Sequence, residues 1–457
     1  MSDPRPFWTL DRVADALAPI AVTPPPRGAT ALSAVNTDTR SVAPGNLFVA
    51  LRGERFDAHE FLAEAVRKGA AAVVVSDATA AATLGVPAYV VPDTTVALGI
   101  LGRYRRRAWG RTVVAVAGSN GKTSTKELTS AALGTRLSVY ATRGNLNNQV
   151  GVPLTLLAIP DDADVAVVEI GTNHPGEVAT LRAIAEPDVA IVTSIGEEHL
   201  EGLGDLAGVL REESAVFENV GVAIAPAAQP EIGEAARRLA RSVVSAGLDA
   251  GDVRPDSWSI APDGAGVLRF GDVEARPPLR GEHNLRNAML AIATARTLGV
   301  SLEDAAAGIA RTPALPMRSA WLDIGRFTVI NDAYNANPAS ARESLRMLGA
   351  LDTTRQRVAI LGSMLELGGA GPALHDEIAH LALRGPAAIV AGIGEFSRAL
   401  PAAAPGDSRV VVAPDVPELW HNLVSRLQPD AVILLKGSRG TRLERLIPLI
   451  EEAAKTR

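Results

Sequence analysis

The sequence contains no cysteine, little lysine and no long apolar run. The absence of cysteine from all 457 residues excludes disulfide bonds, thiolate metal sites and cysteine nucleophiles. No run reaches the roughly 18 apolar residues typical of a membrane span. The first residues lack the basic end and apolar stretch typical of a secretory signal. These absences predict a cytoplasmic protein with no membrane span.

Lysine is scarce, and the chain has no excess of basic charge. Five of the 45 basic residues are lysines, namely Lys68, Lys122, Lys126, Lys436 and Lys455. Because the composition is biased towards arginine, each lysine that remains is mildly informative. The formal net charge of −6 argues against a broad nucleic-acid surface, which needs many cationic contacts to phosphates. The basic cluster at 103–107 is more typical of a solvated helix end or a linker.

The length and the order of apolar segments predict three α/β domains. At roughly 150 residues per domain, a chain of 457 residues contains about three. Short β-branched runs alternate with Ala- and Leu-rich stretches, a pattern typical of parallel sheets. We expect domains at 1–108, 109–313 and 314–457, with a proline-containing linker and hinge at 311–318. The third domain has five such strands and is expected to be Rossmann-like. The predicted strands lie at 47–51, 71–75, 88–91, 112–118, 164–171, 188–196, 327–332, 357–362, 387–392, 409–414 and 430–437.

The segment GSNGKT at 118–123 predicts a phosphate-binding loop. It follows an apolar strand and precedes a helix-compatible stretch, so backbone N–H groups at a helix N-terminus would face the phosphates. Lys122 would neutralise phosphate oxygens, and Thr123 would offer its hydroxyl to Mg²⁺. The common spelling of such a loop needs a glycine where this sequence has Val116. The alternative is a Gly/Asn turn before an ordinary helix.

Two strands of the second block end in residues that a magnesium site would use. Glu169 ends one apolar run, and His199 lies in the loop after the next. In an open parallel sheet the carboxyl ends of the strands lie on the ligand-binding side. A single histidine is more often structural and a single glutamate at a strand end is usually solvated. The prediction therefore depends on both residues occurring together with the phosphate loop.

These motifs resemble those of the Mur ligases, ATP-dependent enzymes that form amide bonds in peptidoglycan synthesis. The phosphate loop of that family has the form G-[TS]-N-G-K-[TS], and this shorter form explains Val116. The segments YNANP and LNNQVGVP are the most discriminating, and the sequence lacks the DNPR motif typical of the enzyme that adds the third stem-peptide residue. The similar segments extend through the whole chain, at 36–61, 142–157, 281–290, 331–340, 361–368 and 434–440.

The resemblance implies a specific reaction. An ATP-dependent ligase would join D-Ala-D-Ala to the terminal carboxylate of UDP-N-acetylmuramoyl tripeptide through an acyl phosphate, giving ADP, phosphate and the pentapeptide. It would use ATP and two Mg²⁺ ions, act as a monomer, and bind neither nucleic acid nor a membrane. No protein nucleophile is needed, in agreement with the absence of a serine or cysteine triad.

The resemblance also implies roles for individual residues. Those expected to bind ATP are Gly118, Ser119, Asn120, Gly121, Lys122, Thr123, Ser124, His283, Asn287, Arg318 and Asp332. Those expected to bind the other substrates are Asn36, Asp38, Arg40, Asp57 and His59 in the first domain, Thr142, Asn145 and Asn148 in the second, and Tyr334, Asn335 and Asn337 in the third. Lys122, Glu169, His199 and Glu213 are the expected catalytic residues, and Thr123, Glu169, His199 and Glu213 the expected metal ligands. For the polar residues of the first domain, the alternative is an ordinary turn or capping function.

The sequence departs from the family pattern at Glu213. The family normally has a carbamylated lysine there, which holds a second Mg²⁺. A carbamate is a carboxylate on a long stem, so Glu213 supplies the same anionic oxygens on a shorter one. The alternative is that Glu212 and Glu213 form a solvated helix face and that the second metal site is weak or built otherwise. Asn331 and Ser363 are lesser departures, since related sequences commonly have acidic residues there.

Three other classes of protein fit parts of this pattern. One is another amide ligase of the same architecture, such as a folylpolyglutamate synthase. The second is a P-loop kinase or motor ATPase, and the third is a scaffold that binds a nucleotide without turnover. They differ from the expected ligase in whether phosphate release depends on the dipeptide.

Overall fold

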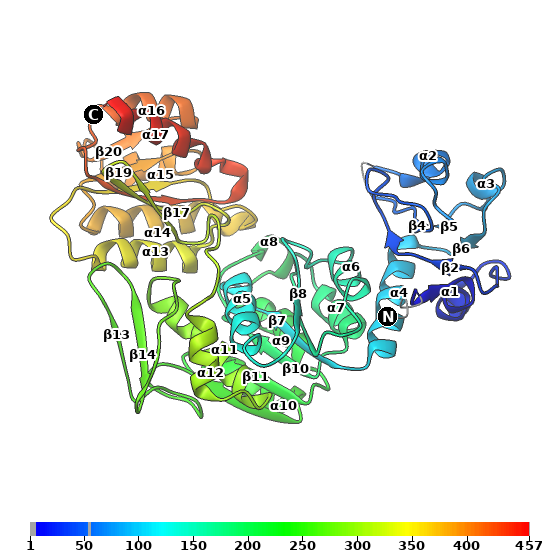
Figure 1. The fold of residues 1–457 in the computed structure, drawn as a ribbon. Coiled ribbons are helices and arrows are strands. Elements are labelled where there is room, and N and C mark those ends of the chain that lie inside the picture. The colour runs from blue at the N-terminus through cyan, green and yellow to red at the C-terminus, as the bar shows by residue number, and fades with distance from the viewer. Residues whose placement is uncertain (1–5, 54–55, 457) are drawn as a thin grey trace. The chain divides into compact units, whose positions relative to one another are not determined.

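The computed structural model describes residues 6–53 and 56–456 and arranges the chain in two compact units. We describe each unit by itself, and Figure 1 labels the elements of both. Across the described parts of the chain, no helix is long and apolar enough to cross a membrane. The first unit comprises Met1–Ala115, Tyr140–Ile170 and Ala179–Pro187, and the second comprises Val116–Val139, Gly171–Val178 and Asp188–Arg457.

The first unit begins with a four-stranded parallel sheet of order β3-β4-β5-β6. The central strands β4 and β5 are buried along their whole length, as expected for apolar runs in a parallel sheet. The elements of this part are β1 Trp8–Thr9, α1 Leu10–Leu17, η1 Ala18–Ile20, β2 Ala31–Leu32, β3 Val35–Asn36, β4 Leu47–Val49, η2 Ala58–Phe61, α2 Leu62–Arg67, β5 Ala72–Val75, α3 Ala78–Ala81, β6 Ala88–Val90 and α4 Thr94–Trp109.

The basic cluster at 103–107 lies inside α4, and the prediction of a solvated end or linker is wrong for two of its arginines. Arg105 and Arg106 are buried, with 5% and 7% of their surface exposed. Arg105 donates to the carbonyl oxygen of Ile159 at 2.7 Å, and Arg106 donates to that of Ala185 at 3.1 Å. These guanidinium groups therefore join α4 to the segment after α6 and to the last residue of α7.

The rest of the first unit contains the strand that ends in Glu169. Here α6 begins after Asn148, whose side-chain oxygen accepts a hydrogen bond from the backbone N–H of Gly151 at 2.9 Å. The elements in or at the edge of this part are β8 Val139–Ala141, α6 Gly151–Leu157, β9 Val165–Glu169 and α7 Glu177–Ala185.

The first half of the second unit surrounds the phosphate loop. Strands β10, β11 and β12 are parallel neighbours, and β10 lies beside the end of β7. A small antiparallel sheet of order β13-β14-β15 follows. The elements are β7 Thr112–Ala117, α5 Lys122–Leu133, β10 Val189–Val192, α8 Leu200–Leu203, α9 Leu206–Ser214, η3 Ala215–Phe217, β11 Val222–Pro226, α10 Pro230–Leu239, β12 Ser242–Ala246, β13 Ser257–Ile260, β14 Gly266–Phe270, β15 Val273–Ala275, α11 Glu282–Thr297 and α12 Leu302–Ile309.

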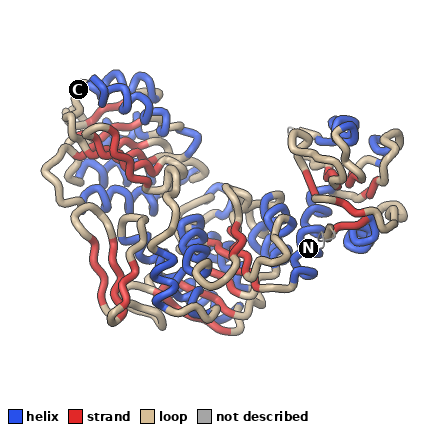
Figure 2. Tube along the Cα trace, in the orientation of Figure 1, coloured by secondary structure: helices blue, strands red, loops and turns tan. Residues whose placement is uncertain are grey.

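The second half of the unit is a six-stranded sheet of order β16-β17-β21-β18-β19-β20, in which only β16 is antiparallel to its neighbour. Figure 2 shows these strands in red between blue helices. The elements are β16 Ala320–Ile324, β17 Phe327–Asp332, α13 Pro338–Ala350, β18 Arg357–Leu361, η4 Gly368–Ala370, α14 Gly371–Arg384, β19 Ile389–Gly392, α15 Phe396–Ala403, β20 Val410–Val412, α16 Val416–Val424, β21 Val432–Lys436, η5 Arg439–Thr441, η6 Leu443–Arg445 and α17 Leu446–Thr456.

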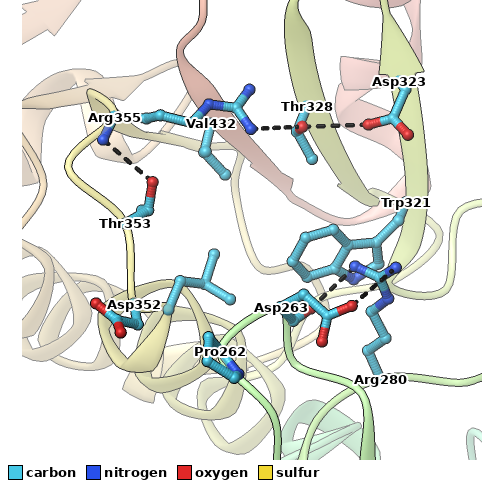
Figure 3. Close-up of a pocket in the computed structure, with 11 residues that line it drawn as sticks. Pro262, Asp263, Arg280, Trp321, Asp323, Thr328, Asp352, Thr353, Arg355 and Val432 are labelled. Carbon is cyan, nitrogen blue, oxygen red and sulfur yellow. Dashed lines mark hydrogen bonds and ion pairs between the residues drawn. The ribbon is translucent and has the colours of Figure 1, made fainter.

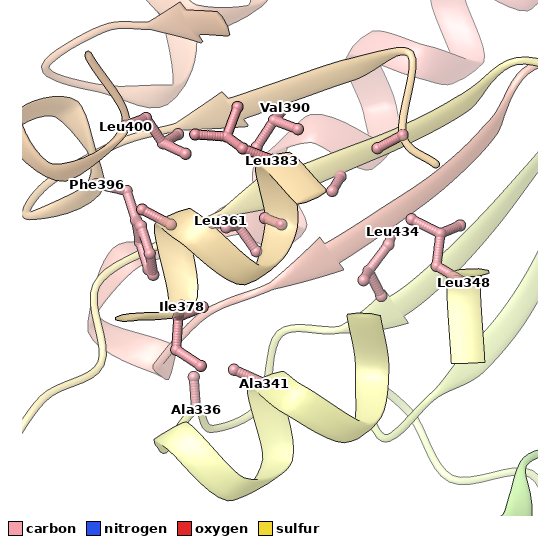
Figure 4. Close-up of a cluster of buried hydrophobic side chains, with 14 of the residues drawn as sticks. Ala336, Ala341, Leu348, Leu361, Ile378, Leu383, Val390, Phe396, Leu400 and Leu434 are labelled. Carbon is pink, nitrogen blue, oxygen red and sulfur yellow. The ribbon is translucent and has the colours of Figure 1, made fainter. Parts of the chain in front are cut away.

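Both faces of this last sheet are apolar and covered by helices. On one face Leu361, Val390 and Leu434 pack against residues of α13, α14 and α15, such as Ile378 (Figure 4). The other face is covered by a second cluster that includes residues of α16 and α17. Burial on both faces explains why these strands are continuous apolar runs. The register places Asp332, Lys436 and Leu361 side by side at the carboxyl ends of three adjacent strands.

All of the strands predicted from apolar runs are present, and the segment 311–318 contains neither helix nor strand, as expected for a linker. Its action as a hinge and the division into three domains stay predictions. The sequence analysis missed the short strands β1, β2 and β3, the strands β8, β11, β12 and β16, and the antiparallel strands β13, β14 and β15.

Candidate active site

The backbone of the phosphate loop requires its two glycines. Gly118 has φ +116° and Gly121 has φ +83°, which are left-handed conformations that favour glycine. A β-carbon on Gly118 would lie 2.4 Å from the hydroxyl oxygen of Thr193, and one on Gly121 would lie 2.7 Å from Oδ1 of Asn287. The loop therefore packs directly against the end of β10 and against α11.

The loop after β10 supports the phosphate loop by hydrogen bonds. The Thr193 hydroxyl donates to the carbonyl oxygen of Asn120 at 2.6 Å, and the backbone N–H of Asn120 donates to the Ser194 hydroxyl at 3.2 Å. The N–H of Gly196 donates to the Ser119 hydroxyl at 2.9 Å. The predicted loop is thus held in one conformation before any ligand arrives.

Lys122 begins α5 and lies over its own loop. Its ammonium group donates to the carbonyl oxygen of Gly118 at 2.5 Å, and it lies 3.9 Å from Oε1 of Glu198. Thr123 and Ser124 are buried in the first turn of the same helix. The helix N-terminus and this cation favour an anionic ligand at the loop.

Two buried carboxyl groups, Glu198 and Glu213, lie behind the loop. Glu213 has no exposed surface, and its Oε2 accepts a hydrogen bond of 2.7 Å from the N–H of Gly118. Burial and the neighbouring Glu213 raise the pKa of Glu198 to about 8, although Lys122 opposes this change. Burial likewise raises the pKa of Glu213. Among the described residues, Oε1 of Glu213 and Oε1 of Glu198 accept no hydrogen bond from a donor group, and the closest cation to Glu198 is Lys122.

Glu212 does not form a solvated helix face with Glu213, so that alternative is wrong. It is 7% exposed and accepts hydrogen bonds from the N–H groups of Gly176 at 2.7 Å and Val178 at 2.8 Å. Glu212 therefore caps the start of α7, while its neighbour contacts the phosphate loop. Adjacent carboxylates on α9 have separate functions.

His199 lies between the carboxyl pair and a loop of the last sheet. It has φ +48°, and its Nε2 is 3.8 Å from Glu198. Its Nδ1 lies 2.5 Å from the carboxylate of Glu366, a residue of the loop after β18. Burial and the nearby Lys122 lower the pKa of His199, which favours the neutral imidazole needed by a metal ligand.

The carboxyl end of the last sheet carries a buried ion pair. The ammonium group of Lys436 donates to Asp332 at 2.7 Å and to the carbonyl oxygen of Asn335 at 2.9 Å. The Ser344 hydroxyl donates to Asp332 at 2.7 Å, and the N–H of Ser319 donates to it at 2.9 Å. Burial alone would raise the pKa of Asp332, but the Lys436 charge and these hydrogen bonds hold it below its usual value.

This edge of the sheet contacts the phosphate loop. Asn337, which caps α13, donates to the side-chain oxygen of Asn120 at 3.0 Å. Arg342 of α13 pairs with Glu197 at 3.1 Å and with Glu377 at 2.9 Å. The structure therefore brings predicted residues of the nucleotide site and of the dipeptide site into direct contact within one unit.

Tyr334 is covered by arginine side chains. The guanidinium carbon of Arg318 lies 4.0 Å from the centre of the Tyr334 ring, and that of Arg439 lies 5.5 Å from it. Both distances are within the range of cation–π contacts. Arg439 was not among the predicted site residues.

The predicted adenine-side residues lie at the start of α11. The side chain of Asn287 packs against Gly121 and donates to Asn284 at 3.1 Å. Nε2 of His283 is 3.0 Å from the side-chain nitrogen of Asn284, and burial lowers the pKa of His283. These three residues form one polar group next to the phosphate loop.

In the first unit, Glu169 and Thr142 lie at the ends of the neighbouring strands β9 and β8. The Glu169 carboxylate accepts a hydrogen bond from the side chain of Asn147 at 2.9 Å, and its backbone N–H donates to the Thr142 hydroxyl at 2.9 Å. Asn145 is exposed, while the side-chain oxygen of Asn148 accepts from the N–H groups of Val150 and Gly151, directly before and at the start of α6. The sequence analysis chose Asn148 and Asn145 from this loop and missed Asn147.

The predicted uridine-side residues form two turns of the first unit. The carboxylate of Asp38 accepts from the backbone N–H of Arg40 at 2.9 Å and pairs with its guanidinium group. Asn36 accepts from the N–H of Asp38 at 2.8 Å. Asp57 caps η2, and its Oδ1 lies 2.6 Å from Nδ1 of His59. These side chains have the turn and capping contacts of the alternative interpretation.

The predicted metal ligands do not form a complete set of protein ligands. Thr123, His199 and Glu213 belong to the second unit and Glu169 to the first. In the described part of the chain, no three His, Asp or Glu side chains are arranged to hold a metal ion. Mg²⁺ commonly takes only one or two carboxylates and completes its shell with water and substrate phosphates. The oxygens of Glu198 and Glu213 fit that chemistry.

Glu198 and Lys436 are the functional candidates that the sequence analysis missed or left without a role. Glu198 directly precedes His199, and an acidic residue next to a predicted ligand was an available signal. Lys436 is one of the few lysines and ends the last strand of a parallel sheet. Their partners, Glu213 and Asp332, are distant in sequence, so only the fold shows the pairs.

A cavity of about 310 Å³ lies at the opposite edge of the last sheet (Figure 3). It is lined by Thr328 and Val432, near the amino ends of β17 and β21, and by Trp321, over which Arg280 stacks at 4.2 Å. None of the predicted site residues lines it. The charged edge with Asp332 and Lys436 and this cavity are therefore separate features.

Here a predicted phosphate loop contacts the charged carboxyl edge of a second, mostly parallel sheet. This arrangement is typical of an α/β enzyme that uses a nucleoside triphosphate. Residues 31–106 match the Mur ligase family catalytic domain, 116–295 the Mur ligase middle domain and 317–439 the Mur ligase glutamate ligase domain. The chain belongs to the Mur ligase family.

Individual relatives agree over nearly the full length. The UDP-N-acetylmuramoyl-tripeptide–D-alanyl-D-alanine ligase of Escherichia coli is 34% identical, over 92% of this chain and 94% of its own. The enzyme of the same name from Bacillus subtilis is 32% identical, over 92% and 93%. A crystal structure of MurF from Acinetobacter baumannii superposes with a TM-score of 0.88 at 33% identity, covering 97% and 99% of the two chains. MurF ligase from Thermotoga maritima in complex with ADP gives 0.81 at 27% identity, over 93% of this chain and 98% of its own.

Proposed function

We propose that this chain joins D-Ala-D-Ala to UDP-N-acetylmuramoyl tripeptide at the expense of ATP. The terminal carboxylate of the tripeptide takes the γ-phosphoryl group and becomes an acyl phosphate, with release of ADP. The free amine of the dipeptide attacks the acyl carbon, phosphate leaves, and an amide bond and a proton result. The product is UDP-N-acetylmuramoyl pentapeptide.

The observation that carries this proposal is the contact between Asn120 of the phosphate loop and Asn337, next to the ion pair of Asp332 and Lys436. A kinase needs the phosphate loop, but it does not need a second sheet whose carboxyl edge contacts that loop. A ligase needs both, because the acyl phosphate and the incoming amine have to meet away from water. The near full-length similarity to ligases of this name supports the same conclusion.

The phosphate loop binds and orients ATP. The N–H groups at the start of α5, from Gly121 to Ser124, and the ammonium group of Lys122 face the phosphates, and Lys122 stabilises charge on the transferred phosphoryl group. On ligand binding Lys122 exchanges its contact with the Gly118 carbonyl for phosphate oxygens. Asn287, His283 and Arg318 are the proposed contacts to the rest of the nucleotide.

Glu198, Glu213 and the Thr123 hydroxyl are the proposed Mg²⁺ contacts beside the loop, and Glu169 and His199 stay ligands that only the resemblance implies. When bound, the ion would neutralise phosphate charge and polarise the phosphoryl group. Glu213 supplies a carboxylate without carbamylation, and its contact with Gly118 keeps that carboxylate at the loop. A bound cation would replace the proton that burial favours on Glu198 and would compensate the charge of both carboxylates.

The other substrates are assigned by the resemblance and by placement in the fold. Tyr334, Asn335 and Asn337 are proposed to contact the dipeptide, and Thr142, Asn145 and Asn148 the tripeptide. Asn36, Asp38, Arg40, Asp57 and His59 are proposed to contact the uridine nucleotide. We also infer that the enzyme acts in the cytoplasm as a monomer.

The deciding experiment measures phosphate release with ATP, Mg²⁺ and UDP-N-acetylmuramoyl tripeptide, with and without D-Ala-D-Ala. We expect release to depend on the dipeptide and to match the pentapeptide formed, as identified by its mass. Phosphate release that is independent of the dipeptide, without amide product, indicates an ATPase or kinase. Nucleotide binding with no release at all indicates a scaffold.

A further inference from the structure

Arg318 and Arg439 both lie over the ring of Tyr334, at 4.0 Å and 5.5 Å from its centre. Tyr334 follows β17 and Arg439 follows β21, and these strands are adjacent in the sheet. Both residues therefore lie at the carboxyl ends of parallel strands, where open α/β sheets bind their ligands.

Neither arginine is neutralised within the protein. Among the described residues, no carboxylate forms an ion pair with Arg318 or Arg439, and neither has a side-chain hydrogen bond. By contrast, Lys436 is paired with Asp332, and Arg342 of the same region is paired with two glutamates. An aromatic ring holds a guanidinium group in place and leaves its N–H donors available for an anion.

The free anionic group of the proposed acceptor is its carboxylate. D-Ala-D-Ala has an amine at one end and a carboxylate at the other, and the amine has to face the acyl phosphate. A guanidinium group repels an ammonium group and binds a carboxylate in a bidentate manner. A cation at the far side of the dipeptide site therefore favours the productive orientation.

We propose that Arg439 binds the carboxylate of D-Ala-D-Ala and so selects dipeptides with a free carboxyl end. This assignment rests on the proposed function. Arg318 is the arginine nearer the ring and remains assigned to the nucleotide. Arg439 belongs to the loop after Lys436, and the ammonium group of Lys436 donates to the carbonyl oxygen of Asn335 in the proposed dipeptide site. The ring of Tyr334 contacts the guanidinium groups of both arginines, which have different proposed ligands.

The test compares D-Ala-D-Ala with D-alanyl-D-alaninamide, in which a neutral amide replaces the carboxylate. For the wild-type enzyme we expect kcat/KM to be at least about tenfold lower with the amide. This first comparison needs no variant. Equal kcat/KM for both acceptors would overturn the proposal.

Variants then assign the effect to Arg439. In Arg439→Ala the KM for D-Ala-D-Ala should rise by roughly tenfold or more, and the difference between the two acceptors should disappear. Arg439→Lys retains the charge and should keep part of the discrimination. The matched control is Arg445→Ala, which removes an exposed arginine six residues further along the chain, at the end of η6, and should leave both values unchanged.

The KM for ATP separates this role from nucleotide binding. We expect it to stay the same in Arg439→Ala. A rise in the KM for ATP with unchanged discrimination between the acceptors would show that Arg439 serves the nucleotide, and the proposal would fail. The proposed function fails separately, if the wild-type enzyme forms no amide with either acceptor.

Discussion

Two groups of acidic residues in this chain differ in how their charges are compensated. In the first unit Asp38 and Asp57 are bonded within their own turns, and hydrogen bonding from Arg40 lowers the pKa of Asp38 to about 2. Behind the phosphate loop, Glu198 and Glu213 are buried, and burial raises both pKa values.

The difference indicates which carboxylates the protein uses for its own structure. A carboxylate with a lowered pKa already has its donors and gains little from a ligand. A buried carboxylate with a raised pKa is costly in the free protein and gains most when a cation arrives. We therefore expect substitutions behind the loop to affect catalysis more than substitutions in the N-terminal turns.

The largest effect is expected for Lys122→Met. This change removes the cation that faces the phosphates and leaves Glu198 and Glu213 without a compensating charge. The kcat of ligation should fall by at least about 10²-fold. Steady-state phosphate release with all three substrates measures it. Lys126→Met is a poor control because Lys126 is buried. The exposed Lys455→Met, in α17, serves instead and should retain full activity.

The second effect concerns the carboxylate that replaces the carbamylated lysine. Wild-type activity should be the same in bicarbonate-free and bicarbonate-supplemented buffer, because Glu213 carries its charge without CO₂. In Glu213→Lys, activity should fall roughly tenfold or more without bicarbonate and recover in part when bicarbonate is added. Glu213→Gln is the matched control, which bicarbonate should not rescue. A marked rise of wild-type activity with bicarbonate contradicts this role of Glu213.

A smaller effect concerns the stability of the ligand-free protein between about pH 4.5 and pH 8. The pKa of Glu198 is raised in the folded state to about 8 from an ordinary 4.5, so the folded protein binds the proton more tightly. Its contribution to stability is complete below the ordinary pKa and is lost as the pH rises through the folded value. Thermal denaturation of Glu198→Gln should therefore show a weaker decline of Tm over this window than the wild type. Identical pH profiles would show that Glu198 does not titrate there.

The smallest effect is expected for Asp38→Asn. Asp38 is bonded to Arg40 within its turn, so the substitution should raise the KM for UDP-N-acetylmuramoyl tripeptide by about threefold at most. The KM for ATP should not change. If the variant loses thermal stability while every KM stays the same, Asp38 is a turn residue and the uridine assignment is wrong. A loss of activity larger than that of Glu213→Lys would contradict the expected difference between the two groups of carboxylates.

Much of the fold was predictable because parallel strands are buried on both faces. The predicted strands 327–332 and 430–437 have apolar centres, at Val329 and Ile330 and at residues 431–435, so composition alone located them. The antiparallel strands β13 and β15 are short and partly exposed, and they lack that signal. The burial of Arg105 was not predictable, because its acceptor, the Ile159 carbonyl, is 54 residues away in the sequence.

The candidate site was predictable where a short motif carries the chemistry. Gly118, Gly121 and Lys122 occur in one short loop, and the two glycines allow its left-handed backbone conformation. Glu198 and Arg439 were missed because neither belongs to a motif with a defined role. Their significance depends on Glu213 and Tyr334, which only the tertiary structure places beside them.

The hydrogen bond between Asn337 and Asn120 has a practical consequence for inhibitor chemistry. It directly connects the loop that is proposed to hold the phosphates with the loop that is proposed to hold the dipeptide. A single compound that links a phosphate mimic to a D-Ala-D-Ala mimic therefore needs only a short, polar connector that replaces this amide pair. Joining two weak fragments in this way raises the effective concentration of the second at its own site, so such a compound is expected to bind far more tightly than either fragment alone.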